Sequence, residues 1–253
     1  MRLFRKKVKP DIKVKTVLCI PGSWKDRSEI VTSIALKNLG EFIFAGKILL
    51  NLKTNIGFEI EIFDRDDRMK ESFKWAGMVN MLSDEYLELI DKHVFVVYIV
   101  GETGDLQKAK SIAEAGLAVL KSGGIGIKVE TSGKAFSKEQ WADLIIKYQE
   151  SNLYKMFVLD SISDVKGTTY SCGMHNLGFK DTIVSGEHFQ ESVNLISTFG
   201  YYQLIDKPSI MSNQTFSSSA NSPIFQIIEE QNQPYKDHKL FRNPFGMWRL
   251  KRK

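Results

Sequence analysis

Residues 94–130 contain the pattern that most restricts the fold. VFVVYIV (94–100) is apolar at every position, which is typical of a strand buried on both faces in the middle of a sheet. A helix is predicted over 105–122, and IGIKVE (125–130) predicts a second strand. Together they predict a βαβ unit, right-handed if the two strands are parallel. The chain therefore has to build a sheet with at least one helix packed on it.

The segment GGIGIKVETSGKAF joins the second strand to the next helix. Its glycines do not form a phosphate-binding loop, which needs GxxxxGK[ST] between a strand and a following helix, whereas Gly123 and Gly124 follow a helix. They are predicted to end that helix in a left-handed turn. Glu130, Ser132 and Lys134 lie past the carboxyl end of the strand, where they either meet a ligand or form a solvated loop.

Before this unit, the sequence predicts a strand, a helix and a hairpin. KTVLCIPG (15–22) is a short apolar strand, and the helix over 23–39 has Ile30, Ile34 and Leu36 on one face.

The predicted hairpin consists of two β-rich stretches, 41–54 and 58–66, separated by Asn-Ile-Gly. Alternation in FEIEIF places Glu59 and Glu61 on one side, so we expect this hairpin to have one solvent-exposed face.

The second half predicts a series of strands and one long helix. Strands are expected in LYKMFVLDSI (153–162), TTYSCGM (168–174) and DTIVS (181–185), followed by a helix over 188–205. PIFQIIEE (223–230) is predicted to be the last strand.

These elements predict an α+β (mixed α/β) fold of two small lobes. We expect an N-terminal lobe over 1–92 and a C-terminal lobe over 93–253 that contains the βαβ unit and an antiparallel hairpin. A Ser/Asn-rich loop over 211–222 is long enough to be mobile or functional. The 253 residues, 43% of them hydrophobic, suffice for a core.

Charge is concentrated at the two ends. Residues 1–15 and 236–253 each carry seven Lys or Arg and one Asp, so each end is +6, whereas the whole chain is +5 and its middle is net acidic. Basic ends either bind nucleic acid or an anionic surface, or serve as solubilising tails. In RNPFGMWRLKRK, Phe245 and Trp248 are predicted to dock the terminus onto the core.

The sequence contains no motif for a cofactor, a closely spaced metal site or a membrane span. No apolar run approaches the roughly 20 residues of a span, and the amino terminus lacks the apolar region of a signal peptide. Cys19 and Cys172 form no CxxC pair, and the four His are scattered. We expect a cytoplasmic protein without a cofactor or a metal.

Three residues at the first strand-to-helix turn are candidates for binding. GSWKDR presents Trp24, Lys25 and Arg27, which either engage an anionic or protein partner or, in the case of Trp24, fold back as a hydrophobic staple.

Two His residues are weaker candidates. His93 and His175 would form an acid/base set with Glu130 if they met in a cleft. The favoured alternatives are a His93 stabilised by the helix dipole and a His175 hydrogen-bonded within its own turn.

FDRDDRM offers Asp64, Asp66 and Asp67 as possible cation ligands. It lacks the DxDxDG pattern and the position-twelve Glu of an EF-hand, and Arg65 and Arg68 intervene. Pairing between these Asp and Arg residues at a helix start is the favoured interpretation.

CIPGSWKDRSE, FDRDDRM, GGIGIKVETSGKAFSKEQW and GMHNLGFKD together resemble a bacterial family catalogued as a domain of unknown function. The resemblance covers most of the chain, and its most specific part is GGIGIKVETSGKAF with the Trp141 that follows. It implies no activity, cofactor or substrate.

The absence of catalytic spacing favours a non-catalytic protein-binding module with a protein partner, of which a toxin-neutralising or accessory protein is one form. One alternative is a hydrolase-like enzyme with a site between the lobes around Glu130 and His93. The other is weak nucleic-acid binding through the basic ends.

Overall fold

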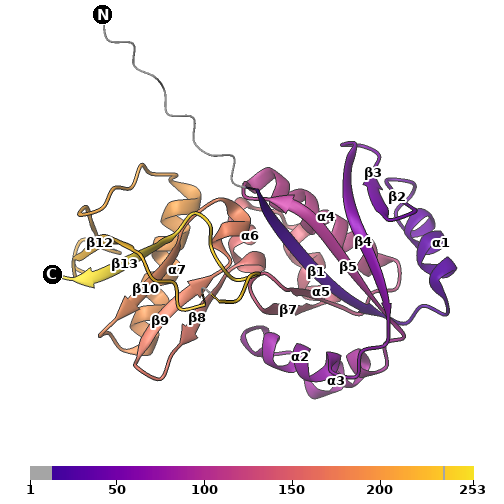
Figure 1. Cartoon of the computed structure of the whole chain (residues 1–253), viewed down its shortest axis with the longest axis horizontal. Helices are drawn as coiled ribbons and strands as arrows, with labels where there is room; N and C mark the ends of the chain where they lie inside the picture. The colour runs from indigo at the N-terminus through magenta and orange to yellow at the C-terminus, as the bar shows by residue number, and fades with distance from the viewer. Residues whose placement is uncertain (1–12, 236) are drawn as a thin grey trace, which may run out of the picture.

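The computed structural model describes residues 13–235 and 237–253. These residues form two β-sheets, and Figure 1 shows the seven-stranded sheet in one half of the view and the six-stranded sheet in the other. Strands and helices occur in both halves, which confirms the predicted α+β class. No helix in the described ranges is long and apolar enough to cross a membrane. The basic residues 1–12 lie outside these ranges.

The seven-stranded sheet is antiparallel throughout, with β5 at its centre in the order β2-β3-β4-β5-β1-β6-β7. β5 is the central strand, as expected, but only one of its faces is fully buried: Val97 and Ile99 are 0% exposed, whereas Tyr98 and Val100 on the other face are partly exposed. The strands are β1 (Val14–Gly22), β2 (Phe42–Ala45), β3 (Ile48–Asn51), β4 (Ile56–Asp64), β5 (Phe95–Thr103), β6 (Gly126–Val129) and β7 (Lys134–Ser137).

The predicted βαβ unit is present with one strand inserted. β5 and β6 both run antiparallel to β1, which lies between them, so they are parallel to each other and are joined by α4 (Leu106–Lys121). Gly123 has φ 122°, and Gly124 N–H donates to Val119 O (3.1 Å). The two glycines therefore end α4 in a Schellman turn, as predicted.

Helices cover the two faces of this sheet unequally. One face packs against α1 (Arg27–Lys37), α4, α5 (Lys138–Ile146) and α6 (Glu150–Phe157). Within the described ranges, the other face packs only against α2 (Met69–Ala76), the 3₁₀ helix η1 (Met78–Asn80) and α3 (Asp84–Asp91), and Figure 1 shows α2 and α3 together at the bottom of the view. No helix of the described residues covers the rest of that second face, which we call the open face.

The amphipathic patterns were mostly sufficient to orient these elements. Glu59 and Glu61 are exposed on the open face, as expected for the hairpin. Ile30 and Ile34 of α1 are fully buried, but Leu36, predicted to share their face, is 76% exposed. Leu36 is two residues from Ile34, a spacing of about 200° on a helix, and therefore points to solvent.

The six-stranded sheet has the order β11-β12-β13-β10-β9-β8 and packs against α7 (Phe189–Ile205). Its neighbouring strands are antiparallel except β10 and β13, which are parallel. The 3₁₀ helix η2 (Met174–Leu177) connects β9 to β10. The strands are β8 (Leu159–Ser163), β9 (Thr168–Cys172), β10 (Asp181–Ser185), β11 (Thr215–Phe216), β12 (Phe225–Glu230) and β13 (Met247–Arg252).

Two expectations for this half were wrong. The first part of LYKMFVLDSI is helix α6, because Leu153, Met156 and Phe157 recur at i, i+3 and i+4 and are all buried. The last strand is β13 and not PIFQIIEE, which forms β12. Trp248 is 7% exposed, which confirms that this end of the chain packs onto the core. It does so as strand β13 of the second sheet.

The boundary expected at residue 92 falls inside the first sheet. β5, which follows it, pairs with β4 and β1, which precede it. The change from one sheet to the other comes later in the chain, between β7 and β8.

A buried polar network joins the two halves. Asn176 of η2 is fully buried, and its Oδ1 accepts hydrogen bonds from Thr16 Oγ1 in β1 (2.6 Å) and Thr131 Oγ1 in the β6–β7 turn (2.9 Å). Its backbone O accepts from Gly104 N–H (3.1 Å), and Thr16 also bonds Thr103 (2.8 Å). These side chains, called the junction network below, hold η2 against the end of the seven-stranded sheet.

At Gly173, which precedes η2, the backbone packs closely against α6 and the β6–β7 turn. A Cβ there would lie 2.0 Å from Phe157 O and 2.9 Å from Ser132 Cβ, at φ +117°. Replacing Gly173 by Ala is expected to lower the free energy of unfolding by more than about 3 kcal/mol, measured by urea denaturation. Gly186→Ala is the control, because Gly186 also has positive φ (86°) but an added Cβ there would meet no atom within 4 Å. This substitution should lower the free energy of unfolding by only about 1 kcal/mol. Equal decreases for the two variants would show that the backbone at Gly173 is not closely packed.

Candidate functional site

The tip of the turn between β6 and β7 is buried, so Ser132 is neither solvated nor accessible to a ligand, whereas Glu130 at the start of the turn is partly exposed. Thr131 and Ser132 are each 1% exposed, and the N–H groups of Ser132 and Gly133 both donate to Val129 O. The six-stranded half covers the turn: Cys172 Sγ lies 3.8 Å from Thr131 O. Polar residues at this strand end therefore form part of the junction.

Lys134 supports the same junction. It is 7% exposed, and its Nζ donates to Lys155 O (2.7 Å) and Val158 O (3.2 Å) at the end of α6. The last carbonyls of a helix lack intrahelical partners, and a cation there also suits the helix dipole. Burial lowers the pKa of Lys134 to about 8. A side chain engaged in this way does not reach a ligand in solvent.

Glu130 differs from its neighbours because it faces the open side of the sheet. Its carboxylate pairs with Lys128 Nζ at 3.1 Å, and Lys128 also donates to Ser72 Oγ in α2 (2.8 Å). Of the three residues predicted in this segment, only Glu130 lines a groove.

Trp24 lies in the core, and only its neighbours are exposed. Trp24 is 2% exposed, and its Nε1–H donates to Ser122 O (2.6 Å) beside the end of α4. Lys25 and Arg27 face solvent, where Arg27 pairs with Asp64 (3.2 Å). The aromatic anchor of the predicted binding surface is therefore unavailable, and the fold-back interpretation of Trp24 is correct.

The two His residues and Glu130 share no hydrogen bond in the described structure. His93 Nδ1 bonds Ile90 O (2.8 Å), and its Nε2 accepts from Asp66 N–H (3.1 Å). Burial lowers the pKa of His93, so it is a neutral structural group and not a cation stabilised by the helix dipole. His175 is 2% exposed in η2, and neither ring nitrogen has a described partner, contrary to the expected local hydrogen bond.

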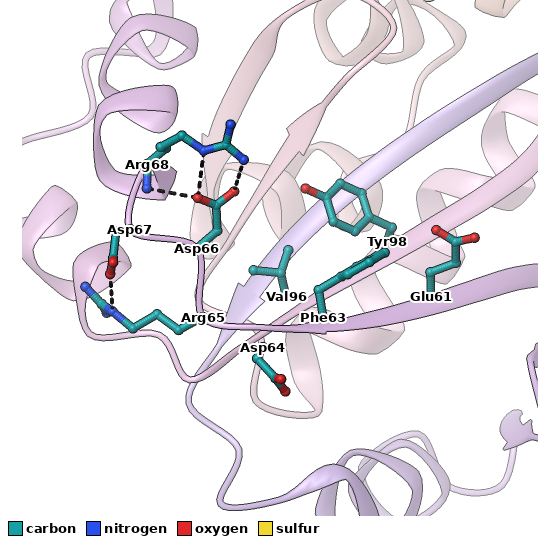
Figure 2. Close-up of a pocket in the computed structure, with 9 residues that line it drawn as sticks. All are labelled: Glu61, Phe63, Asp64, Arg65, Asp66, Asp67, Arg68, Val96 and Tyr98. Atoms are coloured by element: carbon teal, nitrogen blue, oxygen red, sulfur yellow. Dashed lines mark hydrogen bonds and ion pairs between the residues drawn. The ribbon is translucent and has the colours of Figure 1, made fainter.

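FDRDDRM forms the ion pairs that the sequence predicted. Arg68 binds Asp66 through two N–H groups (2.9 and 3.0 Å), and Arg65 binds Asp67 (2.9 Å) and Asp91 (3.0 Å), as the dashed lines of Figure 2 show in part. No group of three potential metal ligands occurs within residues 13–235 and 237–253.

The main concave surface of the first sheet lies on its open face. We call it the open-face groove; Figure 2 shows its first part, which holds about 800 Å³. A second part of about 760 Å³ adjoins it, since both are lined by Tyr98 and by residues 66–68, which directly precede α2. The residues that line the two parts include Glu61, Phe63, Asp64, Asp66, Arg68, Trp75, Tyr98, Lys128 and Glu130.

Strand register explains why these residues meet. Tyr98 of β5 is opposite Glu61 of β4 and Cys19 of β1, and Cys19 is opposite Lys128 of β6. Directly opposite residues of antiparallel strands project from the same face, so this row crosses four strands on the floor of the groove. Burial raises the pKa of both Cys19 and Tyr98, so both are protonated at neutral pH and Cys19 is no nucleophile.

An exposed apolar surface begins at one wall of the groove. Trp75 lines the groove at the end of α2, and three apolar residues of the following turn are also exposed. We call these four the 75–81 patch: Trp75, Met78, Val79 and Met81, which are 64%, 61%, 50% and 86% exposed.

Sequence reasoning missed both of these surfaces, although signals for each exist. The alternation of FEIEIF had placed Glu61 on a solvent face, but only strand order brings Tyr98 beside it. WAGMVNM contains four large apolar residues that no helical or strand period buries, and this lack of periodicity is the available signal for the 75–81 patch.

His175 generates a prediction for the pH dependence of stability. Burial lowers the pKa of His175 from 6.5 to about 4. Between these two pH values the unfolded chain binds a proton at His175 and the folded chain does not, so the free energy of unfolding decreases as the pH falls from 6.5 toward 4. The loss amounts to about 3 kcal/mol for a shift of this size. When the free energy of unfolding is measured by urea denaturation at several pH values from 7 to 4, His175→Gln should remove most of this decrease.

The control is His188→Gln at the exposed start of α7. Its free energy of unfolding should decrease between pH 7 and pH 4 as much as that of the unmodified protein. Comparing variants is necessary because burial raises the pKa of Asp181 to about 6, which changes stability in the opposite direction over an overlapping pH range. An unchanged decrease in His175→Gln would show that His175 is not the group responsible.

Comparison with protein-family models, curated proteins and solved structures finds no match to this chain. The resemblance to a bacterial family of unknown function therefore stays a prediction.

Proposed function

We propose that this chain is a non-catalytic protein-binding module whose partner covers the 75–81 patch and the adjoining part of the open-face groove. The exposure of four large apolar side chains within seven consecutive residues carries the proposal. Exposed large apolar side chains beside a groove are typical of protein interfaces, where Trp and Met are enriched.

The backbone beneath the patch is held rigidly, which supports a role in binding. Asn80 Nδ2 donates to Ala135 O of β7 (2.6 Å), and Asn80 O accepts from Gln140 Nε2 of α5 (2.8 Å). Met81 adopts the left-handed conformation (φ 50°, ψ 49°), which is uncommon for a bulky residue. Side chains presented on a fixed backbone lose less entropy when a partner binds.

The hydrolase alternative has less support. The nitrogens of His93 are engaged by Ile90 and Asp66, and Glu130 is paired with Lys128. A general base has to be positioned at a reacting group, and these side chains are instead occupied in separate structural contacts.

The nucleic-acid alternative has less support at the carboxyl end. Arg249 pairs with Glu230 (2.6 Å), and Arg252 pairs with Glu187 (2.8 Å). Charges neutralised within the protein contribute less to counterion release. The basic residues 1–12 at the amino end are outside the described ranges.

We propose the cytoplasm as the compartment. Cys19 and Cys172 are both free and buried thiols, which suits a reducing environment. A toxin-neutralising or accessory role is one form that the proposed binding would take there.

The proposal predicts that the patch controls partner affinity. After a stoichiometric partner has been isolated from the native cell and purified, Met81→Ser should weaken its binding about ten-fold or more by isothermal calorimetry, because a central apolar contact is worth about 1.5–3 kcal/mol. The thermal midpoint should change little, since Met81 is 86% exposed.

Leu36→Ser is the matched control, because Leu36 is 76% exposed on α1, which covers the opposite face of the sheet. It should leave the affinity unchanged. Equal affinities for the two variants, or the absence of any stoichiometric partner, would contradict the proposed function.

A further inference from the structure

We propose that the Glu61 end of the open-face groove binds an arginine side chain of the partner. This inference rests on the proposed function and specifies the chemistry of the partner. The partner would be a protein segment that places an arginine in the groove and an apolar side chain of its own on the 75–81 patch.

The geometry combines a carboxylate with aromatic rings. Glu61 and Phe63 are two residues apart on β4 and therefore project from the same face, and Tyr98 is directly opposite Glu61. Phe63 and Tyr98 meet edge to face, with ring centroids 5.6 Å apart and an interplanar angle of 85°. Figure 2 shows all three side chains on one side of the sheet, whereas Asp64 points away from them.

Charge distinguishes Glu61 from the other acidic residues of this groove. Asp64, Asp66 and Asp67 are paired with Arg27, Arg68 and Arg65. Glu61 has no ion pair within the described residues. Nor does either neighbouring arginine reach it: Figure 2 shows Arg68 turned toward Asp66 and Arg65 toward Asp67. The groove therefore presents one carboxylate whose charge is not neutralised locally.

An arginine matches this combination better than a lysine or an apolar side chain. A guanidinium is planar, so it can donate two N–H groups to the Glu61 carboxylate while its face lies on an aromatic ring. Phe63 is 51% exposed and offers such a ring. Cation–π contacts contribute about 0.5–2 kcal/mol. The net negative charge of the middle of the chain also attracts a basic partner.

The test uses N-acetyl-arginine amide as the probe, titrated into the full-length protein and followed by NMR. We expect saturable shifts at Glu61, Phe63 and Tyr98, with weak, millimolar affinity because the probe is small. Glu61→Gln should weaken binding about five-fold or more, which corresponds to about 1 kcal/mol. The neutral analogue N-acetyl-citrulline amide should produce no saturable shift.

Glu59→Gln is the matched control. Glu59 is exposed on the same strand and the same face and does not line the groove, so its substitution removes the same charge but should leave affinity within about two-fold. Three results would overturn the inference: no saturable shift, equal weakening by both substitutions, or binding of N-acetyl-lysine amide as strong as that of the arginine probe. Thermal unfolding of each variant confirms that it is folded.

Failure of this inference is distinguishable from failure of the proposed function. If arginine does not bind but Met81→Ser still weakens the partner, the arginine site is wrong and the protein-binding role stands. If the arginine probe binds as predicted but Met81→Ser leaves the partner's affinity unchanged, the proposed role of the patch is wrong.

Discussion

The contact between the β6–β7 turn and η2 is the constraint on which the rest of the structure depends. Asn176 accepts hydrogen bonds from β1 and from the turn, and Lys134 bonds the end of α6. The side chains of Asn176 and Lys134 are both buried, and an unpaired polar group there would cost about 1–3 kcal/mol. The two sheets are consequently held by specific polar contacts as well as by apolar packing, and the residues that make them are not free to bind a ligand.

The two faces of the first sheet differ in how far helices cover them. Among the described helices, α1, α4, α5 and α6 pack on one face, whereas α2, η1 and α3 cover only part of the other. The uncovered part has polar side chains in register across four strands and an apolar wall at Trp75. A surface with charged groups, aromatic rings and exposed methionines next to one another suits a protein partner better than a small substrate, because its contacts are spread over a wide area.

Much of the fold follows from local patterns, but the candidate site does not. The continuous apolar run predicted β5 as the central strand, and the position of Gly123 predicted the end of α4. The burial of Ser132 and Lys134 was not predictable, because the residues that cover them follow about 40 and more than 20 positions later in the chain and the turn itself is polar. Trp24 was ambiguous for the same reason: its partner, Ser122, is distant in sequence. The groove depends on the order β4-β5-β1-β6, which alternation within single strands does not determine.

Native-state hydrogen exchange measures directly whether the junction makes the two sheets one cooperative unit. The amides of Ile99 in β5 and Val184 in β10 both belong to buried residues, one from each sheet. If the junction couples the sheets, these two amides should exchange with the same free energy of opening, within about 1 kcal/mol, and Asn176→Ala should lower both together. A free energy of opening several kcal/mol lower in β10 than in β5 would show that the second sheet unfolds independently and would contradict the account.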